Sequence, residues 1–158
     1  MQNITPCFWF NRQAEEAANF YVSLFRNSRI STVLRYPENS PGGEAGTVMT
    51  VCFELDGQEY LALNGGPEFN FTEAISLIVY CEDQGEVDRM WAGLTEGGEE
   101  VQCGWLKDKF GISWQVVPRV LDEMFSNPDT RKVDRVNQAM LKMVKLDIAE
   151  LKRAFDGN

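Results

Sequence analysis

An internal repeat constrains this chain more than any other feature of its sequence. Apolar residues mark one face of a predicted helix over 13–25 and one face of a second predicted helix over 84–95. Adding 70 to each position of the first set gives the second, so that Ala17, Phe20, Tyr21 and Leu24 become Val87, Met90, Trp91 and Leu94. The same offset places the strand-like segment 8–10 on 78–80. An offset shared by a strand, a helix and the hairpin that follows indicates a duplicated strand–helix–strands unit.

The elements expected in the two repeats follow one order. The first repeat is predicted to contain a strand over 4–10, the helix over 13–25, a strand over 29–36, a loop over 37–46, and strands over 47–55 and 58–64 joined by an Asp56-Gly57 turn. The second is predicted to contain a strand over 73–82, the helix over 84–95, and strands over 99–107 and 112–117 on either side of a turn that includes Asp108.

The last section of the chain is expected to be helical. The first predicted helix covers 119–127. The second begins after a cap at Asp129 or Thr130, and the third covers 148–155 with Asp147 as its cap. The fold class is therefore α+β, a single domain over 1–158 with modules at 1–67 and 72–118 and a helical tail at 119–158. Each helix needs an apolar sheet face to pack against, so the opposite sheet faces are expected to enclose a cleft.

The chain contains no histidine. This excludes Ser-His-Asp and Cys-His nucleophiles, a histidine general base and every histidine-bound metal. The four cysteines, Cys7, Cys52, Cys81 and Cys103, form no C-x-x-C motif and lie in apolar, strand-like runs. We therefore expect four buried thiols in a reducing compartment and no metal site.

The charge of the chain also excludes functions. The net charge of −9 argues against a nucleic-acid surface, because a polyanion requires clustered Lys and Arg. Residues 131–158 are weakly basic, which is typical of a solvated helix face. No segment approaches the ~18 apolar residues of a membrane span, and the start, MQNITPCFWF, lacks the basic region of a signal peptide. A cytoplasmic protein without membrane or nucleic-acid partners is expected.

Several segments together resemble one known family. They are FWF at 8–10 with AEEA at 14–17, LALNGG at 61–66, CGWL at 103–106 with DKFG at 108–111, SWQVVP at 113–118, and the stretch from Ala139 to Ile148. The chain resembles the PhnB-like branch, often labelled "3-demethylubiquinone-9 3-methyltransferase" domain proteins, of the vicinal oxygen chelate superfamily. That superfamily includes glyoxalase I, bleomycin-resistance proteins and extradiol dioxygenases. The resemblance implies paired βαβββ modules and a homodimer.

The resemblance also implies where a metal would be held. In metal-dependent relatives the module strands supply His, Gln or Glu to one divalent ion, and the matching positions are Pro6, Ser76, Gln115 and either Ala62 or Asn64. Proline has no donor side chain, and neutral Ser, Gln and Asn oxygens do not hold a divalent transition ion without an anion or an imidazole. The fold is therefore expected without its metal chemistry, and metal-dependent glyoxalase or dioxygenase activity is the least favoured function.

The predicted ligand site is a mostly aromatic cleft between the modules. Side-chain alternation assigns to it Phe8, Phe10, Tyr60, Asn64, Ser76, Ile78, Tyr80, Ser113, Gln115 and Val117. Trp9 and Trp114 are expected on the opposite faces, beneath the helices. Such a cleft suits a flat or partly apolar small molecule, the alternative being that the aromatic side chains fill it themselves. Gln115 is expected to hydrogen-bond either the ligand or a neighbouring strand.

The leading functional prediction is a cofactor-free, metal-free homodimer that binds a small organic molecule. One alternative is an enzyme that uses Tyr, Gln and backbone groups, or that transfers a methyl group to a quinone-like phenol. A typical S-adenosylmethionine site follows the first strand with a glycine-rich turn, whereas here residues 11–14 contain no glycine. Another alternative is a dimeric scaffold whose helical tail contacts a partner.

Overall fold

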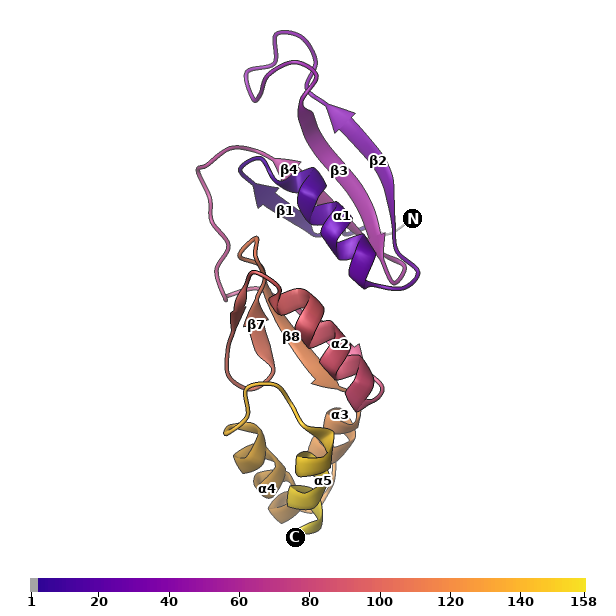
Figure 1. Cartoon of the computed structure of the whole chain (residues 1–158), viewed down its shortest axis with the longest axis vertical. Coiled ribbons are helices and arrows are strands. Elements are labelled where there is room, and N and C mark those ends of the chain that lie inside the picture. The colour runs from indigo at the N-terminus through magenta and orange to yellow at the C-terminus, as the bar shows by residue number, and fades with distance from the viewer. Residues whose placement is uncertain (1–2) are drawn as a thin grey trace. The chain divides into compact units, whose positions relative to one another are not determined.

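The computed structural model describes residues 3–158. The chain forms two compact units, which meet in the sequence between Asn70 and Phe71. The first unit is coloured indigo to magenta in Figure 1 and the second pink to yellow. Among the residues described, no helix is both long enough and apolar enough to cross a membrane.

The first unit is a four-stranded sheet with one helix. Its elements are β1 (Cys7–Phe10), α1 (Ala14–Leu24), β2 (Arg29–Arg35), β3 (Val48–Leu55) and β4 (Gln58–Asn64). The strand order is β1-β4-β3-β2, with β1 parallel to β4 and the other pairs antiparallel. The predicted Asp56-Gly57 turn joins β3 to β4, and both residues have positive φ, as a two-residue hairpin requires. Helix α1 lies across one face of this sheet (Figure 1).

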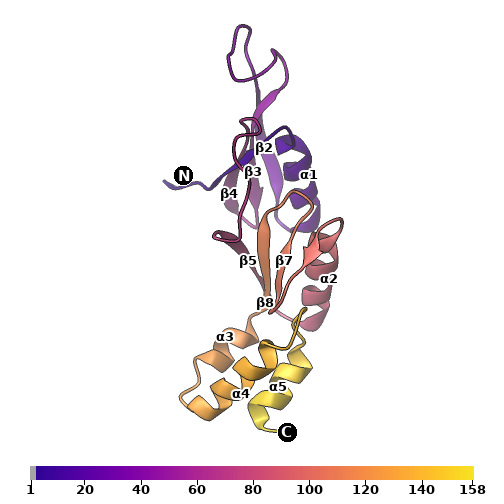
Figure 2. The ribbon, with the colours of Figure 1, turned by 90° about the vertical axis from the view of Figure 1, so that its left-hand side faces the viewer.

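The second unit repeats this topology and adds three helices. Its sheet contains β5 (Ser76–Cys81), β6 (Glu99–Glu100), β7 (Trp105–Lys107) and β8 (Ser113–Pro118) in the order β5-β8-β7-β6, with β5 parallel to β8. Helix α2 (Gln84–Thr95) lies on one side of this sheet (Figure 2). The predicted strand over 99–107 is interrupted, because Cys103 and Gly104 have positive φ and form a turn between β6 and β7. The shared strand order confirms the duplication.

The repeat has different offsets in its strands and its helices. In each unit, the amide of the residue that follows the last strand donates to the carbonyl of the last residue of the first strand. Gly65 donates to Phe10 at 2.9 Å, and Arg119 donates to Cys81 at 2.8 Å. Phe10 therefore corresponds to Cys81, at an offset of 71. The helices correspond at 70, because the connection from β5 to α2 is one residue shorter than that from β1 to α1. Successive side chains of a strand point to opposite faces, so a one-residue error in register exchanges the two faces of the sheet.

Aromatic stacking joins α1 to the sheet of the first unit. Ring centroids are 6.2 Å apart between Tyr21 and Phe53, 5.5 Å between Phe53 and Tyr60, and 5.6 Å between Tyr60 and Phe8. Tyr21 and Phe53 are fully buried. The stack therefore runs from α1 across β3 and β4 to β1 and fixes which face of the sheet the helix covers.

A buried carboxylate organises the β7–β8 hairpin of the second unit. Asp108 accepts hydrogen bonds from the amides of Phe110 and Ile112, at 2.9 and 3.1 Å, and from Nε1 of Trp114 at 2.8 Å. Asp108 and Trp114 are both buried. These hydrogen bonds satisfy the carboxylate, as its burial requires. The predictions of Asp108 as a turn residue and of Trp114 as a core residue are confirmed.

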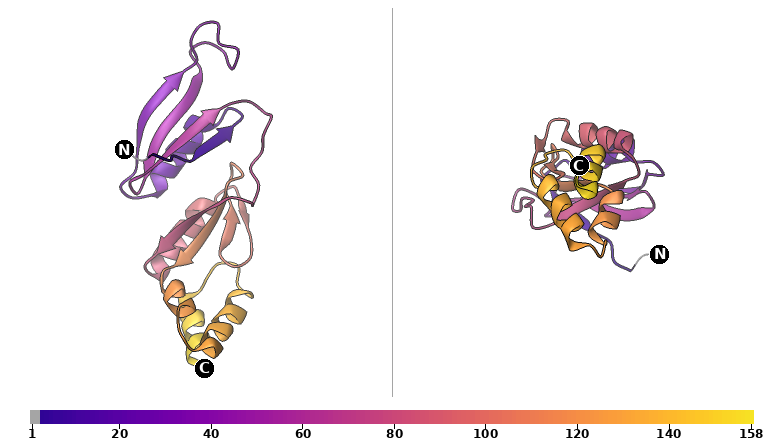
Figure 3. Two further views of the ribbon diagram at one scale, coloured as in Figure 1. Left: turned by 180° about the vertical axis from the view of Figure 1, so that it is seen from behind. Right: turned by 90° about the horizontal axis from the view of Figure 1, so that it is seen from below.

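The tail consists of α3 (Val120–Phe125), α4 (Thr130–Met140) and α5 (Ile148–Asp156) and packs beside the second sheet (Figure 3). Asp129 and Asp147 cap α4 and α5 as predicted, each accepting a backbone amide. A separate apolar cluster holds the three helices together; its buried members are Leu121, Met124, Val136, Met143, Leu146 and Leu151.

The segment between α4 and α5 attaches the tail to the second sheet. The amides of Cys103 and Gly104 donate to the carbonyls of Met143 and Val144 at 2.8 and 2.7 Å. The Gln84 side chain donates to the carbonyl of Leu146 at 3.2 Å and accepts from the amide of Ile148 at 2.8 Å.

Glycine at position 104 permits this close approach. A Cβ atom there would lie 3.0 Å from Cγ of Leu146 and 3.0 Å from the carbonyl oxygen of Val116, at a φ of +81°. We expect Gly104→Ala to lower the free energy of unfolding by about 2–3 kcal/mol, from backbone strain plus the displaced tail.

Gly97→Ala is the matched control in the same unit. Its φ is +72°, but the nearest atom to an added Cβ is Cβ of Lys109 at 3.4 Å, an ordinary contact, so we expect a loss of about 1 kcal/mol. Denaturant unfolding of both variants measures the difference. Equal losses would show that docking of segment 143–146 contributes nothing at this position.

Candidate functional site

The ten residues predicted to line the ligand cleft are divided between the two units. The first unit contains Phe8, Phe10, Tyr60 and Asn64, and the second contains Ser76, Ile78, Tyr80, Ser113, Gln115 and Val117. The two sets also differ in their relation to the helix of their unit, because the first set lies on the helix-covered face of its sheet and the second lies on the uncovered face.

The face predicted for Phe8 and Phe10 is wrong. Both are buried, and Phe8 belongs to the aromatic stack that ends at α1. Asn64 lies at the same end, where its Oδ1 accepts from the amide of Ala14 at 2.9 Å and its Nδ2 donates to the carbonyl of Val48 at 3.0 Å. These contacts build the unit, and the part of Phe8, Phe10, Tyr60 and Asn64 in ligand binding stays a prediction.

Trp9 occupies the face on which Phe8 and Phe10 were expected. Its Nε1 donates to the carbonyl of Gly66 at 2.9 Å, and its ring meets the edge of Phe69 at 5.0 Å. The prediction of Trp9 as a residue beneath the helix is therefore wrong. The segment Phe8–Phe10 is apolar on both faces, so alternation separates the faces but does not identify which one the helix covers.

The second unit presents an open face, which we define as the side of the β5-β8-β7 sheet opposite α2. Alternation along the paired strands places there Ser76, Ile78, Tyr80, Trp105, Lys107, Ser113, Gln115 and Val117. The side chains of Cys81, Leu106, Trp114 and Val116 lie on the other face and are buried. Ile78 and Tyr80 are 47% and 42% exposed, so large apolar side chains on the open face reach solvent.

Cross-strand register arranges the open face in rows. One row contains Ser76, Ser113 and Lys107, the next contains Ile78, Gln115 and Trp105, and the last pairs Tyr80 with Val117. Side chains opposite each other on neighbouring strands are in contact range. The face is therefore polar at the Ser76 end, mixed in the middle and apolar at the Tyr80 end.

Two serines, the Gln115 amide and one ion pair form the polar end. Nε2 of Gln115 donates to Oγ of Ser76 at 2.9 Å, so the bond to a neighbouring strand that was one alternative for Gln115 is present. Oγ of Ser113 is buried and has no hydrogen-bond partner within residues 3–158. Nζ of Lys107 lies 2.7 Å from Oε1 of Glu73, which raises the pKa of the lysine and lowers that of the glutamate through their hydrogen bond.

Arg119 closes the apolar end and was missed by the sequence analysis. Its guanidinium carbon lies 5.1 Å from the ring centroid of Tyr80, and its Nε lies 2.7 Å from Oε1 of Glu82. The hydrogen bond to Glu82 raises the pKa of the arginine. Val117, beside Tyr80, packs against the apolar cluster of the tail. The position of Arg119 directly after the last strand was the available signal.

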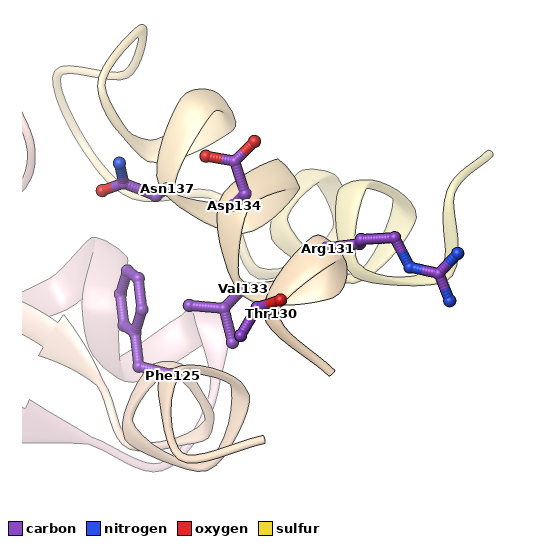
Figure 4. A pocket seen from close by; sticks show the side chains of 6 residues that line it. All are labelled: Phe125, Thr130, Arg131, Val133, Asp134 and Asn137. Atoms are coloured by element: carbon purple, nitrogen blue, oxygen red, sulfur yellow. The ribbon is translucent and has the colours of Figure 1, made fainter. Parts of the chain in front are cut away.

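Two hollows lie away from the open face. A hollow of about 570 Å³ between α3 and α4 exposes Phe125 and Val133, with Arg131 pointing away from Phe125 (Figure 4). A second, of about 550 Å³, lies in the first unit between the start of α1 and the loop after β2, beside Arg12 and Tyr36. Glu15, Glu44 and Glu68 also line this second hollow, so it contains more acidic than basic side chains.

The residues at the metal positions do not fit a divalent ion. Pro6 offers no donor, Ala62 is buried against α1, and both ends of the Asn64 amide are engaged in hydrogen bonds. Ser76 and Gln115 are neutral and bonded to each other. Within residues 3–158, no three His, Cys, Asp or Glu side chains are grouped so as to hold a metal.

The cysteines are free thiols with different environments. Cys81 is buried, Cys7 is exposed, and Cys52 and Cys103 are half-buried, so the prediction of four buried thiols is correct for Cys81 alone. Cys103 is half-buried because it lies in the turn that interrupts the predicted strand.

Two units of one topology, each a mixed four-stranded sheet with a helix on one face, define paired βαβββ modules of the glyoxalase and bleomycin-resistance type, followed by a helical tail. A family model described as 3-demethylubiquinone-9 3-methyltransferase matches residues 2–117. The chain belongs to this family, which is the PhnB-like family expected from its motifs. The match ends before the tail, so the resemblance of the segment from Ala139 to Ile148 lies outside it.

Solved structures agree with this assignment. The PhnB protein from Bacillus cereus is 40% identical, and the match covers 74% of this chain and 99% of that chain with a TM-score of 0.68. The protein PA1353 from Pseudomonas aeruginosa is 20% identical over 75% of this chain and 98% of its own, with a TM-score of 0.61. The fosfomycin resistance protein FosX from Mesorhizobium loti shares the fold at 12% identity, covering 80% of this chain and all of its own, with a TM-score of 0.58. No curated protein matches the chain.

The buried cysteine gives a prediction about thiol reactivity. Desolvation, and then the nearby Glu86 carboxylate, raise the pKa of the Cys81 thiol to about 12. At pH 8 the thiolate, which is the reactive form, is therefore scarce at this position. We expect Ellman's reagent at pH 8 to modify Cys7 in the native protein and Cys81 only after unfolding, as read by peptide mass spectrometry. Cys7→Ser is the control that removes the native labelling of that peptide, and rapid native labelling of Cys81 would contradict the burial.

Proposed function

We propose that this protein binds a small, partly aromatic organic molecule on the open face of its second unit without a metal ion. The observation that supports this most directly is the exposure of Ile78 and Tyr80 beside the Gln115 amide. Apolar side chains grouped on an exposed sheet face leave surface that a ligand would remove from water. The amide beside them supplies a directional hydrogen bond that orients the molecule.

Reversible binding agrees with the chemistry of this face. Ser76 and Gln115 are neutral, and Lys107 and Arg119 are each engaged by a carboxylate. Asp108, the buried carboxylate nearest to the face in sequence, is held by three hydrogen-bond donors of its own hairpin. A general base needs a free basic atom within reach of the reacting proton, and these contacts favour sequestration over catalysis.

The proposal extends to assembly and location. We place the protein in the cytoplasm as a homodimer, without membrane or nucleic-acid partners. Its four free cysteines suit a reducing compartment, and its net charge of −9 disfavours a polyanionic partner.

Tyr80→Ala tests the proposed face. A screen of aromatic small molecules against the full chain is expected to find compounds that shift the NMR signals of the Trp105 indole and the Gln115 side-chain amide. Removing the half-exposed ring should raise the Kd of such compounds at least tenfold, because the ring supplies apolar contact area, while lowering the melting temperature only slightly through the lost contact with Arg119.

Phe69→Ala is the matched control, since Phe69 is also an exposed aromatic residue but lies in the first unit. It should leave the Kd unchanged. A broad screen in which no compound moves the Trp105 or Gln115 signals would instead favour the third function, a dimeric scaffold.

Methyl transfer is the second candidate, because the matching family model has a methyltransferase description. The glycine-rich turn of a typical S-adenosylmethionine site lies between a strand and a helix N-terminus. Here β1 leads to α1 through Asn11, Arg12 and Gln13, and the glycines after β4, Gly65 and Gly66, lead into Pro67 without a helix. These connections disfavour that cofactor.

Calorimetric titration with S-adenosylmethionine separates the two functions. We expect no heat of binding at millimolar cofactor, because the strand-to-helix connections over 11–13, 82–83 and 119 contain no glycine and so lack the glycine-rich turn of such a site. Saturable binding with a stoichiometry of about one per chain would revive methyl transfer and displace simple sequestration as the leading function.

A further inference from the structure

We infer that the molecule bound on the open face is flat and uncharged, and that a hydroxyl or carbonyl group at one end lies against Ser76. This inference rests on the proposed function and adds the chemical class and the orientation of the ligand. It follows from the different chemistry of the two ends of the open face.

At the polar end, the hydroxyl of Ser76 is a neutral donor that is not engaged. Oγ of Ser76 accepts the hydrogen bond from Gln115 at 2.9 Å, so the hydroxyl proton of Ser76 remains available for an acceptor atom. Ser113 is the direct cross-strand partner of Ser76, is 2% exposed, and has an Oγ with no hydrogen-bond partner within residues 3–158. A buried unpaired hydroxyl is costly, and a second hydroxyl beside Ser76 fits a site that receives a polar group.

The charges beside this face are already neutralised. Nζ of Lys107 is 2.7 Å from Glu73, and Nε of Arg119 is 2.7 Å from Glu82. A charged ligand would lose hydration on this face and would have to compete with Glu73 or Glu82 for its counter-charge. An uncharged oxygen loses far less hydration, and the Ser76 hydroxyl replaces part of it.

The other end suits an apolar ring. Tyr80 and Val117 face each other across β5 and β8, Arg119 lies over the Tyr80 ring at 5.1 Å, and Val117 packs against the tail cluster. The tail lies outside the family match, which ends at residue 117. Arg119, which follows the last strand, therefore closes the apolar end. Because the apolar ring of the ligand occupies this end, its oxygen atom points the other way, toward Ser76.

Four matched probes test this inference on the full chain: p-cresol, toluene, p-toluate and 4-methylbenzylammonium. Their Kd values are measured from the NMR shifts of the Trp105 indole and the Gln115 side-chain amide. We expect p-cresol to bind about tenfold more tightly than toluene, and both ions to bind more weakly than toluene. In the double variant Ser76→Ala, Ser113→Ala, the p-cresol Kd should rise about tenfold to the toluene value, while the toluene Kd stays unchanged.

Ser126→Ala, an exposed serine of the tail, is the control and should change neither value. Ser113→Ala alone should keep or raise the melting temperature, because the Ser113 hydroxyl has no hydrogen bond to lose. A lower melting temperature would show that this hydroxyl is paired in the free protein and would overturn its part in the inference. Equal affinities for p-cresol and toluene, or an ion that binds as tightly as p-cresol, would overturn the inference while the proposed function stands. If no probe moves either signal, both are overturned.

Discussion

The packing of one amphipathic helix on one face of each sheet determines everything else in this protein. In the second unit, Val87, Met90, Trp91 and Leu94 of α2 are all buried. Burying these side chains requires an apolar sheet face, so the helix covers the face that supplies it. The other face is not needed for this packing, and in this unit it contains Ser76, Ile78, Tyr80 and Gln115.

The side chains on that face differ from the donors that an open metal site would need. An open metal site needs anionic or imidazole donors that converge on one point. Ser76 and Gln115 instead satisfy each other with a neutral hydrogen bond. Such a pair cannot stabilise a developing negative charge as an ion would, but it can recognise a carbonyl or hydroxyl oxygen. In the proposed function, the same strand positions serve recognition, whereas a charged set would support catalysis.

The sequence predicted the elements well because their signals are local. The apolar stripe of 84–95, the Asp-Gly turn at 56–57 and the caps Asp129 and Asp147 each depend on residues a few positions apart. The orientation of the first sheet was not predictable in this way. Phe8, Trp9 and Phe10 are all large and apolar, so the burial of Phe8 under α1 depends on its stack with Tyr60, which is distant in the sequence. The uniform offset of 70 matched the helix-covered face of the first sheet to the uncovered face of the second. The error arose because the β1–α1 connection is one residue longer than the β5–α2 connection, so the strands correspond at an offset of 71.

The role of the tail shows why the candidate site was also incomplete in the sequence. Arg119 belongs by its position to the connection between β8 and α3, and its place directly after the last strand does not identify the aromatic ring that it contacts. Its contact with Tyr80 exists because β5 and β8 are parallel partners, which brings residues 80 and 117 side by side. Segment 143–148 in turn holds the tail in place through the backbone of the Cys103–Gly104 turn and the Gln84 side chain. The predicted strand over 99–107 is thus interrupted at the turn that receives segment 143–148, and Arg119 closes the apolar end of the open face at the point where the last strand leads into the tail.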